Sequence, residues 1–253
     1  MKIGAHTNPK HPIVEARRRD ADAVQIFLGN PQSWKAPVPR SDEEELKASE
    51  IDVYVHAPYL MNLASPNNRV RIPSRKTLAV TVAAAHRIGA LGVIVHGGSV
   101  GDDEAVSVGF ERWRKALDSF DVTVPILVEN TAGSGNSVMQ DITNYGPLWD
   151  EIGGFNVGVC LDTCHTWAAG QDMENAVGIV SGAIGRPIDL VHANDSRDEA
   201  GSNRDRHANF GSGMIPAELI LGLIREAGAT AIVETPDDDD GQATDIAWLR
   251  ENL

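Results

Sequence analysis

The chain has 253 residues, a hydrophobic content of 42% and a formal charge of −14, which is enough apolar material for a large core and excludes a disordered chain. No apolar run approaches the roughly 18 residues of a membrane helix, and the first residues lack the apolar segment of a signal peptide, so we expect a cytoplasmic protein that contacts no membrane. The negative charge argues at first against nucleic acid as a partner, because nucleic acid usually selects a basic surface.

Short apolar runs alternate with longer segments of helical period along the whole chain. No linker or shift in composition divides them, so we predict a single domain over residues 1–253. The clearest predicted helices cover 41–50, 73–90, 103–120 and 215–228, and the second and fourth stop at Gly89 and Gly228. The predicted strands are 2–6, 23–27, 53–56, 92–96, 125–129, 157–162, 190–193 and 231–234.

Eight alternating strand and helix units in a chain of this length predict an α/β fold, a single (β/α)8 TIM barrel. A doubly wound open sheet is the alternative, but no Gly-x-Gly-x-x-Gly motif follows the first strand. In such a barrel the carboxyl ends of the strands converge on one mouth, where the active site lies. The residues at these strand ends are therefore the candidates for a functional site.

From the third to the eighth, each predicted strand ends in a side chain that can bind a metal ion. Buried carboxylates so close together would repel one another unless cations neutralised them, which argues against coincidence. The loops after the sixth and seventh strands add His165, three residues beyond Asp162, and an extended Asp-x-His segment. One ion takes about four protein ligands and two ions can share them, so this number of ligands suggests two or three ions. The nine candidate ligands are His56, His96, Glu129, Asp162, His165, His192, Asp205, His207 and Glu234.

The remaining histidines and the two cysteines carry less weight. His86 is predicted on a helix and His11 in a loop, whereas His6 ends the first strand and could support the site indirectly. Cys160 and Cys164 cannot form a disulfide scaffold, and we interpret them as small buried residues.

Four segments together resemble the endonuclease IV family of apurinic/apyrimidinic (AP) DNA endonucleases: HAPYLMNLA (56–64), VHGGS (95–99), VCLDTCHTWAAG (159–170) and HANDSRDEAGSNRDRHANFGSG (192–213). The resemblance covers nearly the whole chain and implies a (β/α)8 barrel that holds three zinc ions. Carried onto this chain, it implies one ion on His56, His96 and Glu129, a second on Glu129, Asp162, His192 and Glu234, and a third on His165, Asp205 and His207.

The resemblance also implies an activity. It predicts hydrolysis of the phosphodiester 5' to an AP site in double-stranded DNA, giving a 3'-hydroxyl and a 5'-deoxyribose phosphate, with Glu129 as the catalytic carboxylate shared by two ions. Removal of blocking groups from 3' ends is expected at the same site. Manganese could replace part of the zinc, and we expect the protein to act as a monomer.

Loops after the early strands, here 29–37 and 59–76, are implied to contact DNA around the lesion. An abasic nucleotide has no base to stack, so turning it out of the duplex costs less than turning out a normal one. Tyr59 and Asn62 match family positions near the abasic site, and Arg69 and Arg71 could meet phosphates. The family often has an arginine at the position of Gln32, so this loop could grip or bend DNA through Ser33, Trp34 or Lys35 instead, and Gln32 is kept as a candidate contact.

The main alternative is a sugar isomerase or epimerase on a related barrel, with one or two Mn²⁺ or Mg²⁺ ions. It explains metal-binding side chains at strand ends but neither the group of His165, Asp205 and His207 nor the arginines at 67–76. A DNA-damage binding protein without catalytic activity is a second alternative, which only a turnover assay would distinguish from the nuclease.

The acidic charge of the chain does not exclude DNA as a partner, because zinc would bring positive charge to the mouth of the barrel. The acidic runs 42–45 and 237–240 are expected to be solvated, away from bound DNA.

Overall fold

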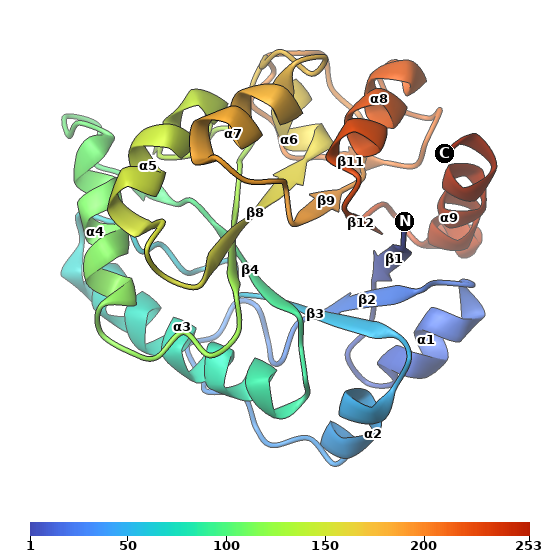
Figure 1. Ribbon diagram of the computed structural model, residues 1–253, viewed down its shortest axis with the longest axis horizontal. Coiled ribbons are helices and arrows are strands. Elements are labelled where there is room, and N and C mark those ends of the chain that lie inside the picture. Colours follow the sequence, from blue (N-terminus) through green and yellow to red (C-terminus); the bar gives the residue numbers. More distant parts are fainter.

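The alternating segments form a closed barrel of parallel strands with the helices on its outside (Figure 1) in the computed structural model, which describes residues 1–253. Neighbouring strands follow the order β1-β12-β9-β8-β6-β4-β3-β2 around the barrel. All eight predicted strands are present, and the predicted TIM-barrel class is confirmed. The barrel strands are β1 (Ile3–His6), β2 (Ala23–Ile26), β3 (Asp52–His56), β4 (Gly92–His96), β6 (Ile126–Glu129), β8 (Val157–Asp162), β9 (Leu190–His192) and β12 (Thr230–Val233).

The helices surround the barrel, and none of them is both long and apolar enough to cross a lipid bilayer. They are α1 (Pro12–Arg18), α2 (Glu43–Ala48), α3 (Asn68–Arg87), α4 (Ser107–Leu117), α5 (Tyr145–Ile152), α6 (Thr163–Ala168), α7 (Ala176–Ile184), α8 (Ala217–Ala227) and α9 (Gly241–Asn252), with short 3-10 turns η1 (Ile142–Asn144) and η2 (Asp238–Asp240). Two small antiparallel pairs join loops: β5 (Ser99–Val100) with β7 (Asn136–Ser137), and β10 (Asp195–Ser196) with β11 (His207–Ala208).

Helix α3 begins five residues earlier than predicted, at Asn68 instead of Pro73. The side chain of Asn67 accepts a hydrogen bond from the backbone N–H of Arg69 and so caps the helix, while Pro73 is accommodated inside it. The helix ends as expected, because Gly89 takes a left-handed backbone conformation just beyond it. The predicted loop 59–76 is therefore shorter, and Arg69 and Arg71 lie on the first helical turn.

The two acidic runs form more ion pairs than expected. In the first run, Asp42 pairs with Arg40 at 2.6 Å, and Glu43 pairs with Arg87 at 3.1 Å. In the second run, Asp237 pairs with Arg18 at 3.0 Å. Part of the acidic charge is thus neutralised within the protein instead of being left to solvent.

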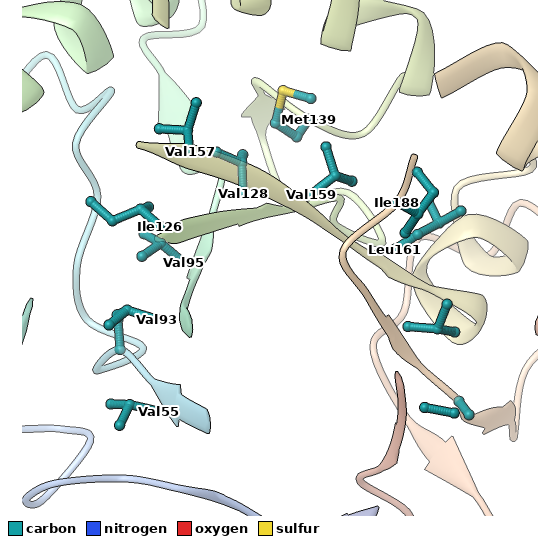
Figure 2. Packing of buried hydrophobic residues seen from close by; sticks show 14 of the residues in the cluster. Val55, Val93, Val95, Ile126, Val128, Met139, Val157, Val159, Leu161 and Ile188 are labelled. Atoms are coloured by element: carbon teal, nitrogen blue, oxygen red, sulfur yellow. The ribbon is translucent and has the colours of Figure 1, made fainter. Parts of the chain in front are cut away.

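Side chains on the barrel strands alternate between the outer face and the interior. The outward set packs beneath the helices, and Figure 2 shows several of its members and close neighbours, including Val93, Val128 and Val159. The inward set fills the barrel with a separate layer that is buried throughout. This inner apolar layer consists of Ala23, Tyr54, Ile94, Leu127, Cys160, Leu190 and Ile232.

Two residues further along the chain from this layer, polar side chains follow on the same inward face, within or at the end of the strand or, for Glu234, one residue beyond β12. Strand pairing sets several of them side by side, as His96 lies opposite Glu129 and Asp162 opposite His192. We call this set the inner polar ring: His6, Gln25, His56, His96, Glu129, Asp162, His192 and Glu234. The period of the strands therefore places these groups together at the mouth, above an apolar floor.

Trp113 on α4 is fully buried, and its indole N–H donates to the carbonyl of Gly97, directly after β4, at 2.9 Å. We expect Trp113→Phe to lower the free energy of unfolding by about 1–3 kcal/mol, because it leaves the buried Gly97 carbonyl without a partner. Urea denaturation measures the change. Trp149→Phe is the matched control, since Trp149 is only partly buried and its indole makes no hydrogen bond within the protein. Equal losses in the two variants would contradict the role of the Gly97 bond.

Candidate metal centre

The first donor group comes from the ends of three neighbouring strands, β3, β4 and β6. Its members are His56, His96 and Glu129. The Oε2 atom of Glu129 lies 3.3 Å from Nε2 of His56 and 3.1 Å from Nε2 of His96. Glu129 is fully buried, so these side chains make a closely spaced donor set at the wall of the barrel.

The second donor group uses the other oxygen of the same glutamate. Its members are Glu129, Asp162, His192 and Glu234. Around Nδ1 of His192 lie Oε1 of Glu129 at 3.0 Å, Oε2 of Glu234 at 3.3 Å and Oδ2 of Asp162 at 3.8 Å. Glu129 thus joins two groups, with one carboxylate oxygen directed to each.

The third donor group lies in the loops, where His165 on α6 meets Asp205 and His207. The Oδ1 atom of Asp205 is 3.2 Å from Nε2 of His165 and 3.1 Å from Nε2 of His207. Asp162 links this group to the second one, because its Oδ1 caps α6 by accepting the backbone N–H of His165 at 2.7 Å while its Oδ2 faces His192. The helix cap and the donor role of Asp162 are therefore compatible.

A buried carboxylate holds the long loop that carries the third group. Asp195 on β10 accepts backbone N–H groups of Gly211, Gly213 and Ile215 at 3.0 to 3.2 Å. Strand β10 pairs with β11, which places His207 opposite Ser196. A loop rich in glycine and asparagine therefore has a defined path beside the barrel mouth.

The imidazole rings have a fixed orientation. Backbone carbonyls accept from Nδ1 of three rings: Ala57 for His56 at 2.7 Å, Asn130 for His165 at 3.0 Å and Glu234 for His207 at 3.2 Å. The Nε2 atom of each of these three rings consequently points toward one of the donor groups. His192 is reversed, with Nε2 bonded at 2.8 Å to the side-chain oxygen of Gln25 and Nδ1 facing the second group.

Charge pairing dominates the protonation of the site. Burial alone would raise the pKa of Glu129, but the imidazoles of His96 and His192 hold that pKa well below its usual range. The pKa of Asp205, whose side chain is half exposed, is also lowered by the neighbouring imidazoles of His165 and His207, against its partial desolvation. Burial opposes the rise in the pKa of His207, which the neighbouring carboxylates bring to about 9. In the protein without metal, imidazolium protons supply the positive charge that a cation would supply.

Several buried atoms that could bind a metal ion make no hydrogen bond within the protein. This feature fits a metal ion most directly. They are Oε2 of Glu129, in the first group, and Nε2 of His165 and Nε2 of His207, in the third. Leaving such atoms unpaired in the interior costs free energy, whereas ion coordination would satisfy them. The set of imidazole nitrogens and carboxylate oxygens is the donor chemistry that zinc accepts.

Cys164 also approaches this site, together with Asp162 and His207. Burial raises the pKa of its thiol to about 12. Without a bound metal the thiol is therefore protonated, and Cys164 is not one of the nine predicted donors. Both cysteines are free and buried, which confirms the prediction made for them.

Two adjoining clefts open onto the donor groups. One, of about 300 Å³, is lined by His56, Tyr59, His96, His165, Asp205, His207, Glu234 and Pro236. The other, of about 360 Å³, extends past Asn62, Ser99 and Ser137. A larger cleft of about 510 Å³ lies between the β1–α1 and β2–α2 loops and contains none of the nine donors. The two smaller clefts are therefore the candidate site.

The predicted DNA-contacting residues occupy different settings. Tyr59 is 54% exposed, and its ring lies 5.3 Å from that of His56 and 6.0 Å from that of His96. Trp34 is 41% exposed and lies with Gln32 and Ser33 in the loop between β2 and α2. Arg69, on α3, is also exposed.

Two of the predicted contacts have partners inside the protein. The amide of Asn62 donates to the backbone and hydroxyl oxygens of Ser99, at 2.9 and 3.0 Å. The guanidinium of Arg71 donates to the carbonyls of Ser65 and Pro66, so it fixes the start of α3. Their contact with DNA remains a prediction.

Sequence reasoning missed three buried amides that hold the donors. Asn130 donates to the backbone carbonyl of Asp162 at 3.2 Å, and Asn194 donates to Oδ2 of Asp162 at 2.7 Å. Gln25 contacts both His192 and Glu234. The signal for Gln25 was present, since a lone amide interrupts the apolar strand AVQI. His6 supports the site as suggested, through a 3.1 Å contact with Glu234.

Comparison with known proteins gives the family. A family model described as a xylose isomerase-like TIM barrel matches residues 13–252. The curated protein "Probable endonuclease 4" of Mycobacterium bovis (strain BCG / Pasteur 1173P2) is 57% identical over 251 residues, which cover 99% of this chain and 98% of that protein.

Solved structures agree with this result. Endonuclease IV from Thermus thermophilus superposes with a TM-score of 0.84 at 30% identity, over 99% of this chain and 98% of that one. A D-tagatose 3-epimerase-like protein has a TM-score of 0.83 over 100% and 97% of the two chains but only 21% identity, so it shows the shared fold alone. The chain belongs to the endonuclease IV family.

Proposed function

We propose that this chain is a zinc-dependent AP endonuclease of DNA base-excision repair. It hydrolyses the phosphodiester 5' to an abasic site in double-stranded DNA and leaves a 3'-hydroxyl and a 5'-deoxyribose phosphate. The observation that carries the proposal is the convergence of three donor groups on one mouth, joined through Glu129 and Asp162. Membership of the endonuclease IV family supports the same activity, and blocked 3' ends are expected as further substrates.

The donor groups are proposed to hold three zinc ions, with Mn²⁺ able to replace part of the zinc. The first ion would be held by His56, His96 and Glu129, the second by Glu129, Asp162, His192 and Glu234, and the third by His165, Asp205 and His207. Bound zinc supplies an activated water nucleophile and neutralises the charge of the phosphate and the leaving oxygen.

The residues of the chain determine how a substrate meets this centre. Glu129 is the catalytic carboxylate, because its two oxygens face two donor groups and fix their separation. Tyr59 borders both clefts and exposes its ring beside His56, where it can contact the sugar of the abasic nucleotide. Lesion recognition would depend on the low cost of turning the abasic nucleotide outward toward these clefts.

Contacts with the rest of the duplex are assigned to the rim of the mouth. Exposed Trp34, with Gln32 and Ser33, is proposed to meet the DNA around the lesion, and Arg69 is proposed to meet a phosphate. Asn62 and Arg71 would contribute from positions already fixed by internal hydrogen bonds. We propose that the enzyme acts as a monomer in the cytoplasm.

A sugar isomerase or epimerase would account for the second donor group but not for the third. His165, Asp205 and His207 form a complete additional set outside the ring of strand ends. Epimerase structures share the barrel at identities too low to show more than the fold. The nuclease assignment is therefore preferred.

We expect Glu129→Gln to lower incision by at least about 10³-fold, a loss at the upper end of that for removing one electrostatic stabiliser, because the amide keeps the shape but removes the shared charge. Incision of a duplex with a single abasic analogue measures the effect. Glu111→Gln, on the exposed surface of α4, should match the wild type. Activity of Glu129→Gln within about twofold of the wild type would refute the assignment.

His207→Ala should remove the third ion and spare the pair around Glu129, because His207 belongs to neither of the other two sets proposed as zinc ligands. Metal analysis should fall from about three zinc ions per chain to about two, and incision should drop strongly. The exposed His86 on α3 provides the control, and His86→Ala should keep both values. A wild type with only one or two ions would favour the isomerase.

Tyr59→Ala should weaken binding to abasic duplex by at least about 1 kcal/mol, because it removes an aromatic contact to the abasic sugar, and should affect undamaged duplex less. Tyr59→Phe should retain most of the affinity, because the ring rather than the hydroxyl lies beside His56. Fluorescence anisotropy with the two duplexes measures the difference. If both affinities fall equally, Tyr59 is a general DNA contact.

A further inference from the structure

Gln25 is a fully buried amide in the middle of β2, where both neighbouring positions are apolar. All of its hydrogen-bonding groups are used inside the barrel. Its Nε2 atom lies 2.5 Å from Oε1 of Glu234 and 2.8 Å from Nδ1 of His6, and its Oε1 atom lies 2.8 Å from Nε2 of His192. Burying an amide is costly unless its bonds are made, and here every bond goes to the inner polar ring.

The chemistry of these contacts allows one orientation of the amide. The NH2 group faces a carboxylate oxygen and an imidazole nitrogen, both of which can accept. The carbonyl oxygen faces Nε2 of His192, which can donate. The reversed amide would set its oxygen against the carboxylate of Glu234 and its N–H groups against His192. Gln25 therefore requires a proton on Nε2 of His192.

His192 differs in this respect from the other oriented rings. His56, His165 and His207 are held through Nδ1 by backbone carbonyls, which no substitution of a side chain removes. His192 is held through Nε2 by a side chain, and it turns Nδ1 toward the carboxylates of the second donor group. Its orientation depends on the residue at position 25.

The same amide also acts on Glu234. The bond from Gln25 occupies Oε1 of Glu234 and leaves Oε2 directed at Nδ1 of His192, 3.3 Å away. Two of the four members of the second donor group are thus aimed by one residue that belongs to none of the groups.

We propose that Gln25 is a positioning residue for the second metal ion: it fixes His192 with Nδ1 as the donor atom and turns Oε2 of Glu234 toward the same ion. This inference rests on the proposed metal-binding function of the second group. Loss of such an outer hydrogen bond typically lowers metal affinity by about 10- to 100-fold. The loss should fall on one ion of the three, because Gln25 makes no hydrogen bond to a member of the first or third group.

Gln25→Met tests the proposal, because methionine has nearly the length of glutamine but makes none of the three bonds. The full-length protein is loaded with zinc, and release of each ion is followed by titration with a competing chelator. One ion should bind about 10- to 100-fold more weakly than in the wild type, while the other two keep their affinities within about twofold. In protein loaded with Co²⁺, the visible absorption of that one ion should change as well.

Gln242→Met is the matched control. Gln242 is also a buried glutamine with three hydrogen bonds, to Arg19, the carbonyl of His6 and the carbonyl of Thr235. This variant can lose stability but should keep all three zinc affinities and the Co²⁺ spectrum. Equal metal affinities in Gln25→Met and the wild type, or equal losses in the two variants, would overturn the positioning role.

A measurement on the wild type covers the case in which Gln25→Met does not fold. In zinc-loaded protein, NMR should detect the Nε2 proton of His192 and show that it exchanges slowly with water, because it is buried and bonded to Gln25. Exchange as fast as that of the partly exposed His96 ring would also overturn the inference. If the Gln25 effect on zinc is present but the wild type does not cut abasic DNA, the nuclease assignment fails and the positioning role stands.

Discussion

Closure of eight parallel strands around one axis is the constraint on which the rest of the structure depends. Because side chains alternate along a strand, every second residue points into the barrel. Closure then brings together the inward residues that lie at the same height along the barrel axis, which form one level. The lower level is apolar, as Leu127 and Ile232 illustrate, and seals the barrel. The next level is polar and includes Glu129 and Glu234. A shift of one residue in any strand would bury a donor under the helices instead.

The carboxylates gathered at this level repel one another, and other groups of the protein compensate this repulsion only in part. Glu129, Asp162 and Glu234 meet around His192, where imidazole protons and amide groups provide the compensation within the chain. The lowered pKa of Glu129 means that its carboxylate stays charged, while its Oε2 atom makes no hydrogen bond. Glu129 is therefore a buried charge without its full set of partners. Divalent cations would resolve both features, which is why the donor geometry and the proposed chemistry support each other.

The sequence predicted the barrel because the strand period is visible in it, and the same period places six of the candidate donors at one mouth, whereas the third group was assigned from the family resemblance. Reading His56, His96 and Glu129 as strand ends required only that the strands be found. The start of α3 was wrong because Pro73 looked like a first helical residue, whereas the cap at Asn67 sets the boundary. The uses of Arg71 and Asn62 depend on contacts with other segments, which no local pattern encodes. Gln25 was visible as an exception to its strand but had no interpretation until its partners were known.

The two kinds of support for the imidazoles suggest how one barrel can serve different reactions. Rings held by backbone carbonyls, such as His56, inherit their orientation from the fold and tolerate changes in neighbouring side chains. His192 relies on Gln25, and the third donor group relies on a loop fastened by Asp195, so these parts can change without altering the strands. Barrels with this fold but low identity share the arrangement of strands. The donors that a sugar isomerase would not need include Asp205 and His207 in the β9–α8 loop, and such a loop can change while the strands of the core are retained.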